Sequence, residues 1–281
     1  MKNEPSLLWI SVSPYLKCFD RRLLARLAKE APVRLWEYAQ TIDEPCCVES
    51  IIDALHSHVE ERIAFECSLD GYSEQAPRRF HLLGHGTSGV IALLYARLYP
   101  HRVASLTMLS VGANPAVNWQ SHYYATRQLL HCSRERVLAQ MVRLLLGKQS
   151  PKFCQALVQL LAHDLDSNLT FHSLGHDISI QPGGTDMPLL VCNGELDSVV
   201  CAQQPALWQA QMKTGDHLWH CPDGRHFFHF HHAKPVAKVI CKHIFQAEKK
   251  SVTDRTGSNT LGDHPLKLYR QAGLSCFLKH P

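Results

Sequence analysis

Compact apolar runs alternate with segments of helical periodicity along most of the chain. Six apolar runs of strand length occur at residues 7–12, 33–38, 79–84, 103–111, 187–194 and 217–221. Apolar residues at helical spacing predict helices at residues 21–30, 48–65, 89–99 and 234–246, and around Trp208. Strands with almost no polar face, separated by helices, are typical of a parallel sheet covered on both sides. The pattern therefore predicts an α/β protein with a doubly wound, mostly parallel sheet, and Asp20 as the N-cap of its first helix.

The strand pattern is absent from residues 113–186, where helical periodicity takes over. One helix is predicted to begin after a Ser133 cap and to end at Gly147, and a second to begin at Pro151. Each places its apolar residues on one face. We therefore expect an all-helical cap inserted into the sheet domain. The domain itself would then consist of residues 1–112 and 187–248.

The end of the chain and its overall composition set further bounds. Residues 249–281 are polar and rich in turn formers, which predicts a flexible tail. The hydrophobic content of 45% over 281 residues is ample for a packed core. A net charge of +4, with scattered Lys and Arg, lacks the footprint of a nucleic-acid-binding protein. No run approaches the roughly 20 apolar residues that span a bilayer, so we expect neither nucleic acid nor a membrane span.

The cysteines and the N-terminal segment indicate a compartment. The 11 cysteines are irregularly spaced and form no C-x-x-C motif, which fits neither a disulfide framework nor a zinc ribbon. The apolar run at residues 7–12 is too short and too weakly flanked for a signal peptide. We therefore expect a cytoplasmic protein with reduced cysteines.

A turn of small residues follows the third predicted strand. The segment His81-LLGHGTSGVIALLYA joins a strand to a helix through a sharp turn at which the two elements nearly touch. It resembles the nucleophile elbow of the α/β-hydrolase superfamily, in its serine esterase and lipase-like branch, where the turn usually reads G-x-S-x-G. Aligning the first glycine on Gly84 puts the nucleophile position at Gly86 and the last small position at Ser88. The nucleophile position is therefore vacant.

The resemblance covers nearly all of residues 7–247. It includes the step from helix to strand at Tyr99-Pro100-His101-Arg102-Val103, which looks like the family's YPxRV. The run from Tyr95 to Gly112 is similar to cyanobacterial members of the superfamily. The resemblance implies an α/β-hydrolase fold.

The same resemblance implies positions for the catalytic acid and base. The segment Gly194-ELD is similar to the family's acid loop, which assigns the acid to Asp197, with Glu195 as the substitute in a shifted register. The segment Pro222-DGRHFFHF is similar to the glycine-x-histidine loop before the last helix, which assigns the base to His226. In the family the imidazole accepts a proton from the nucleophile while the carboxylate fixes its tautomer. Each residue also has a non-catalytic interpretation. Asp197 would then be a solvated turn carboxylate or a helix N-cap, and His226 one of several histidines on a histidine-rich surface.

Two groups are implied as oxyanion donors. One is the backbone N–H of Thr87, the residue after the nucleophile position, and the other lies in the loop after the first strand, where we assign Ser13. Ser88 is the candidate substitute nucleophile. Successive helical residues differ in direction by roughly 100°, however, and a small residue is needed here for the helix to approach the strand.

Phosphate, dinucleotide and metal sites have less support. The turn contains neither G-x-G-x-x-G nor a Walker lysine. His229, His231 and His232 crowd near the predicted base, but no helical H-x-x-x-H or flanking carboxylate pattern accompanies them. We therefore expect no metal and no cofactor.

Three functions remain open, so whether the protein is an enzyme is also open. Loss of the nucleophile leaves only about 10³ to 10⁴ of acceleration over water, which favours a catalytically impaired homologue, a pseudoenzyme that binds a small apolar ligand or a protein partner. The alternative is an active ester or thioester hydrolase that uses water activated by His226 and Asp197, or a displaced nucleophile. The third is a scaffold that binds a protein partner through its cap helices.

Overall fold

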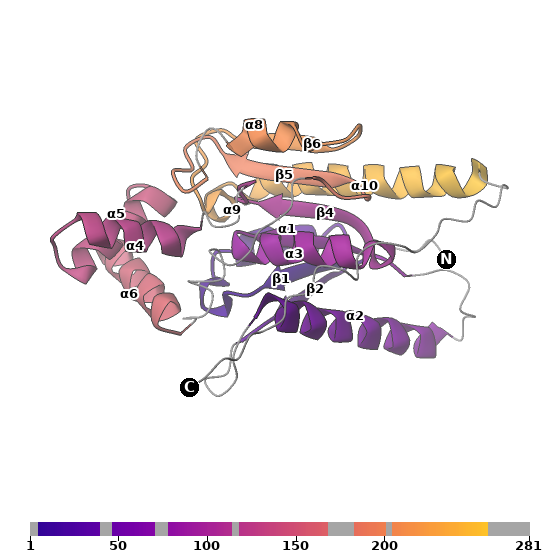
Figure 1. The fold of residues 1–281 in the computed structure, drawn as a ribbon, viewed down its shortest axis with the longest axis horizontal. Coiled ribbons are helices and arrows are strands. Elements are labelled where there is room, and N and C mark those ends of the chain that lie inside the picture. Colours follow the sequence, from indigo (N-terminus) through magenta and orange to yellow (C-terminus); the bar gives the residue numbers. More distant parts are fainter. Residues whose placement is uncertain are drawn as a thin grey trace, which may run out of the picture.

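The computed structural model describes residues 5–39, 47–70, 78–113, 118–167, 183–200 and 204–257. Its centre is one parallel sheet with the strand order β2-β1-β3-β4-β5-β6 (Figure 1). The strands are β1 (Leu7–Ser11), β2 (Val33–Glu37), β3 (Phe80–His85), β4 (Val103–Leu109), β5 (Leu189–Gly194) and β6 (His217–Cys221). Each strand lies within an apolar run identified in the sequence, except that β3 extends one residue further to His85, and the predicted α/β class is confirmed.

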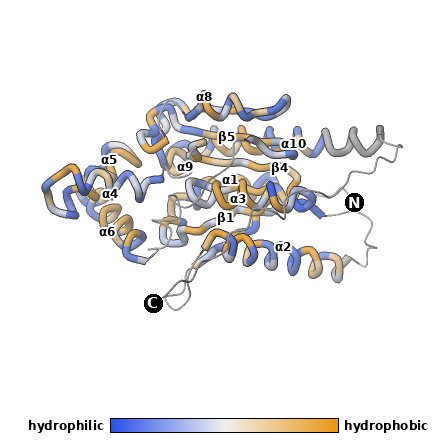
Figure 2. Tube along the Cα trace, in the orientation of Figure 1, coloured by the Kyte–Doolittle hydropathy of each residue, from blue (hydrophilic) through white to orange (hydrophobic). Residues whose placement is uncertain are grey.

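Helices cover both faces of this sheet. They are α1 (Arg21–Leu27), α2 (Val48–Asp70), α3 (Thr87–Leu98), α8 (Gln204–Gln209), α9 (Phe228–His231) and α10 (Ala233–Gly257), with short 3-10 helices η1 (Pro14–Leu16) and η2 (Pro100–Arg102). One apolar cluster joins α2, α3 and α8 to the sheet, and a second joins α1, α9 and α10 to it. Figure 2 shows the hydrophobic character of α3, which lies in the middle of the molecule. The fold is thus a three-layer sandwich.

The central strands explain the near-continuous apolar runs of the sequence. All residues of β1 and β5 are buried, as are all but the last residue of β3. A strand with helices on both faces has no solvent-facing side, so period-two alternation is lost. In β2, at the edge of the sheet, only Trp36 is buried. All strands run in parallel, so their carboxyl ends meet at one edge, where open α/β sheets bind ligands.

Among the described residues between β4 and β5, three helices occur, and we call them the helical insertion: α4 (Trp119–Leu129), α5 (Arg134–Leu146) and α6 (Pro151–Ser167). They lie together at one end of the sheet (Figure 1). Their buried faces form a separate apolar cluster that also includes Leu16, Phe19 and Phe227 from the sheet domain. The insertion is therefore packed onto the rest of the molecule beside η1 and the loop that follows β6.

The predicted ends of α5 agree with the structure. The Ser133 hydroxyl accepts a hydrogen bond from the backbone N–H of Arg136, and Gly147 ends the helix at φ +82°. Helix α4 was not predicted, because its sequence is largely polar on the outside. Its local signal is a capping box, in which Asn118 and Ser121 each accept a hydrogen bond from the other's backbone N–H.

The predicted domain boundaries remain predictions. Residues 114–117 and 168–182, which border or belong to the predicted cap, lie outside the described residues. Helix α10 continues to Gly257, into the predicted tail, and residues 258–281 of that tail lie outside the described residues. Within the described ranges, no helix combines the length and the apolar character that crossing a bilayer requires.

Candidate active site

The turn between β3 and α3 is formed by a close approach of backbone to backbone. A Cβ atom on Gly84 would lie 2.7 Å from the backbone nitrogen of Gly89, and a Cβ on Gly89 would lie 2.5 Å from Cγ2 of Val111. The backbone N–H of Gly86 donates to the carbonyl of Leu109 at the end of β4, at 2.9 Å. Only glycine fits at Gly84 and Gly89, so the packing of α3 against the sheet fixes the turn.

Gly86 lies at the top of this turn with φ +54° and ψ −127°. A positive φ in this range is costly for residues with a side chain and nearly free for glycine. A Cβ atom on Gly86 would meet no atom within 4 Å. The position aligned with a nucleophile therefore has open space above it and no hydroxyl.

The structure brings Asp197 and His226 together. Nδ1 of His226 lies 3.1 Å from one carboxylate oxygen of Asp197 and 3.3 Å from the other. Asp197 also accepts hydrogen bonds from the backbone N–H groups of Val199 and Val200, at 2.9 and 3.1 Å. Because the carboxylate accepts, Nδ1 carries the proton, which leaves Nε2 of the neutral ring as a base. Glu195, the substitute acid, is exposed.

The environment of Asp197 keeps its carboxylate ionised. Burial raises the pKa of this group, but the charge and hydrogen bond of His226 and the two backbone N–H donors outweigh burial, so the pKa lies below its ordinary value. Asp197 is 6% exposed and His226 2% exposed. The pair therefore has the orientation and charge that let a carboxylate stabilise an imidazolium.

Two side chains missed by the sequence analysis hold the His226 backbone. The carbonyl of His226 accepts a hydrogen bond from the Ser110 hydroxyl at 2.6 Å and another from Nε2 of His85 at 2.9 Å. Ser110 has φ +50°, which is rare for a residue with a side chain. His85 directly precedes Gly86, and that adjacency was the available signal for it. Nothing in the sequence marked Ser110.

The His85 ring is neutral. Burial, reinforced by the neighbouring His229 and His226, lowers its pKa well below the usual range, although the hydrogen bond to the His226 backbone acts in the opposite direction. Its centroid lies 4.9 Å from that of His226 and 4.7 Å from that of His229, and the ring stacks on Phe227. A neutral ring that donates from Nε2 fixes the position of the His226 loop without adding a charge.

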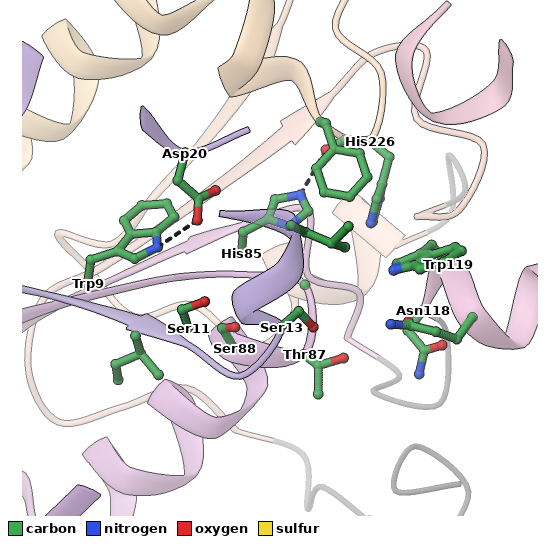
Figure 3. Close-up of a pocket in the computed structure, with 15 residues that line it drawn as sticks. Trp9, Ser11, Ser13, Asp20, His85, Thr87, Ser88, Asn118, Trp119 and His226 are labelled. Carbon is green, nitrogen blue, oxygen red and sulfur yellow. Dashed lines mark hydrogen bonds between the residues drawn. The ribbon is translucent and has the colours of Figure 1, made fainter. Parts of the chain in front are cut away.

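A cavity of about 40 Å³ lies above the turn, at the carboxyl edge of the sheet. Ser11 and Ser13 line it from the end of β1, whereas Asn118 and Trp119 reach it from α4, and His226 closes another side (Figure 3). A water molecule needs roughly 10–15 Å³ of such space, so the cavity is large enough for about three.

Thr87, Ser88 and Ser13 all line this cavity. The Ser88 hydroxyl accepts a hydrogen bond from the backbone N–H of Val12 at 3.0 Å, and no hydrogen bond joins it to His226 in the part of the chain that the structure describes. Ser88 therefore ties α3 to the end of β1. Thr87 and Ser13, the implied oxyanion donors, lie on two elements that meet at the cavity (Figure 3).

A second pair of carboxylate and imidazole lies beside the cavity and was also missed. Asp20 accepts hydrogen bonds from the Trp9 indole N–H at 3.1 Å and from Nε2 of His229 at 3.0 Å. Asp20 is the N-cap residue of α1, as predicted, but its side chain caps no helical N–H. The tertiary partners outcompete the local cap. No group of three or more His, Cys, Asp or Glu side chains within the described ranges is arranged to hold a metal ion.

Two relatives place the chain in a family. A protein of Synechocystis sp., described as uncharacterized protein sll0249, is 38% identical over 237 residues, which cover 84% of this chain and 89% of the relative. A protein of Nostoc sp., described as uncharacterized protein alr2406, is 37% identical over 240 residues, which cover 85% and 90%. The chain belongs to the family of these two proteins. No known family profile matches this member of the family.

Solved structures show which fold the family has. A membrane phospholipase A described as a bacterial virulence factor superposes with a TM-score of 0.65 at 16% identity, covering 88% of this chain and 81% of that one. A thermophilic esterase from Thermogutta terrifontis gives 0.61 at 17% identity, covering 86% and 90%. The type II thioesterase BorB of the borrelidin cluster gives 0.61 at 15% identity, covering 87% and 94%. The predicted α/β-hydrolase fold is confirmed.

Proposed function

We propose that this protein is a catalytically impaired α/β-hydrolase homologue that binds a small ligand in the cavity above Gly86. The observation that carries the proposal is the vacant turn position, which has an elbow-like backbone and no attacking oxygen. Without a nucleophile, oxyanion donors and substrate binding alone accelerate hydrolysis about 10³- to 10⁴-fold over water, far less than a complete triad does.

The cavity lining indicates the chemistry of the ligand. Hydroxyl groups of Ser11 and Ser13, the Asn118 amide and the His226 imidazole surround a small space. Buried polar groups of this kind need hydrogen-bond partners. A short carboxylic acid or ester matches the site, because its oxygens meet these donors. Binding of a larger apolar ligand, and of a protein partner through the helical insertion, stays a prediction.

Hydrolysis by activated water is the second candidate, and the intact pair of Asp197 and His226 favours it. In this reaction Nε2 of His226 takes a proton from a water molecule as the water oxygen bonds to the ester carbonyl carbon. The carbonyl oxygen then carries the negative charge near Thr87 and Ser13. Collapse breaks the carbon–oxygen ester bond, and the leaving alcohol receives the proton from His226.

Ligand binding is tested by thermal denaturation in the presence of acetate, butyrate and their ethyl esters. A ligand that binds only the folded state raises the melting temperature in a saturable way. We expect such a rise for the wild type and a smaller one for Asn118→Asp, which puts a negative charge beside a bound carboxylate. The absence of any saturable rise would count against a ligand-binding role.

Turnover of short-chain nitrophenyl esters and thioesters separates the two candidates. The impaired homologue gives rates that are the same for the wild type and for His226→Ala. Turnover that is lost in His226→Ala but kept in Ser88→Ala supports activated water instead. Turnover that is lost in Ser88→Ala would show that Ser88 supplies the nucleophile, and would contradict both candidates.

A further inference from the structure

A second cavity, of about 290 Å³, adjoins the site described above at Phe227, which lines both. It is formed by the end of α5 and the segment after it, together with the loop after β6 and helix α9. Its volume is close to the lower end of the roughly 300–1,000 Å³ typical of small-molecule sites. The two cavities share Phe227 and no other lining residue.

The second cavity collects positive charge. Lys148 and Arg225 line it, as do His231 and His232, and Asp223 is the one acidic residue among the described residues that line it. None of these five side chains takes part in an ion pair within the described ranges of the chain. Two permanent cations therefore face a cavity with a single counter-charge, and an anion is the natural complement.

The pKa of His231 is lowered in part by cationic neighbours. Burial lowers the pKa of His231, and the nearby His232 and Arg22 lower it further, while a hydrogen bond with the Leu146 backbone acts in the opposite direction. Arg22 is held close by, with its guanidinium 4.8 Å from the Phe230 ring centroid. Burial disfavours a charge of either sign, but the further lowering by Arg22 comes from its permanent positive charge, which also stabilises a bound anion.

The two walls of the cavity are fixed to each other. The Phe227 backbone N–H donates to the Leu145 carbonyl at 3.2 Å. A Cβ atom on Gly147 would lie 3.1 Å from Nε of Arg225, so the glycine allows the guanidinium to lie against the end of α5. The backbone segments that carry Arg225 and Lys148 are thus held next to each other by the fold.

We propose that this cavity binds the phosphate group of a small soluble phosphate monoester. The planar Arg225 guanidinium donates two parallel hydrogen bonds to phosphate oxygens, and Lys148 supplies the second charge. His231 and His232 add ring N–H donors. The organic part of the ester packs on the apolar walls formed by Leu145, Phe227 and Phe228. Free phosphate has no group that could contact these walls.

Isothermal titration of the full chain with phenyl phosphate, glycerol 3-phosphate and inorganic phosphate, at constant ionic strength, tests the site. We expect saturable binding of all three, with phenyl phosphate bound most tightly, because its ring can pack on the apolar walls. Lys148→Gln and Arg225→Gln should each weaken binding by about tenfold or more, because each removes a charge-assisted contact. The matched control is Arg136→Gln, an exposed cation on α5 outside the cavity, and it should stay within about twofold of the wild type.

Lys148 is exposed, so its substitution tests the site even where Arg225→Gln disturbs the neighbouring loop. Three results would overturn the proposal. They are the absence of saturable binding to the wild type, binding to Lys148→Gln as tight as to the wild type, and equal weakening in Arg136→Gln. Binding to phosphatidic acid vesicles without binding to glycerol 3-phosphate would also overturn it, since the ligand would then be a lipid headgroup at a membrane.

Discussion

The turn at Gly86 and the pair of Asp197 and His226 face the same cavity but are held in different ways. At the turn, backbone contacts between Gly84 and Gly89 keep a conformation that would strain a residue with a side chain, although no reactive side chain is present. At the pair, the side chains hold one another, and backbone N–H groups satisfy the carboxylate. A turn shape can therefore persist through packing alone, whereas a buried carboxylate depends on the groups that donate hydrogen bonds to it.

The largest effect is expected from Gly84→Ala, which tests whether packing fixes the turn. The new methyl group would lie 2.7 Å from backbone atoms of Ser88 and Gly89 that cannot move aside freely. We expect a loss of about 3 kcal/mol or more in the free energy of unfolding, measured by urea denaturation. Gly86→Ala meets no atom within 4 Å and should cost only the backbone strain of about 1–3 kcal/mol. Equal stability of the two variants would contradict this account of the turn.

The next effect is expected from Asp197→Asn, which tests whether the pair depends on its charge. Asp197→Asn removes the charge of a buried carboxylate that accepts hydrogen bonds from His226 and two backbone N–H groups, which should cost about 2–3 kcal/mol at neutral pH. The folded-state pKa of Asp197 lies below its unfolded value, so its stabilising contribution is present above the unfolded pKa, near pH 4, and is lost as pH falls through the folded value. The difference between wild type and variant should therefore shrink in acid.

Urea denaturation at a series of pH values measures this difference. The matched control is Asp223→Asn, because Asp223 is exposed and has no ion pair within the described residues. It should change the free energy of unfolding by less than about 0.5 kcal/mol. A difference for Asp197→Asn that stays constant from neutral to acid pH would show that charge does not hold the pair.

The smallest effect is expected from Ser88→Ala, which tests whether the contact between Ser88 and Val12 is independent of the pair of Asp197 and His226. The variant leaves the buried backbone N–H of Val12 without its acceptor, at a cost of about 1 kcal/mol. The pair at His226 should be unaffected, so the pH dependence of stability should match that of the wild type. A change in its acid limb would mean that Ser88 is coupled to the pair.

The strands of the sheet could be predicted from the sequence, because strands buried on both faces appear as short, continuous apolar runs. Trp9, Leu83 and Val191 illustrate this, since each is almost fully buried in the middle of its strand. Helix α4 escaped prediction because most of its residues face outward, and only the capping box marked its start. The hydrophobic pattern therefore predicts elements that are buried, or that bury one clear apolar face, and misses a helix that is mostly exposed.

The positions of Asp197 and His226 were predicted from loops that resemble those of a known family, and the structure brings the two together. The supporting groups were not predictable, because they join distant parts of the chain. Ser110 and His226 are 116 residues apart, and Asp20 and His229 are 209 apart. Nothing near Asp20 in the sequence distinguishes a carboxylate that caps a helix from one that binds a tryptophan and a histidine.

The most direct test of the central claim is labelling by a fluorophosphonate, in which a serine oxygen bonds to phosphorus and fluoride leaves. Mass spectrometry should find no label on the wild type. Gly86→Ser, whose side chain enters open space, should be labelled at position 86, and the label should disappear when His226→Ala is added. Labelling of the wild type at Ser88 or elsewhere in the cavity, or a folded Gly86→Ser that takes no label, would contradict the claim that this site lacks only its attacking oxygen.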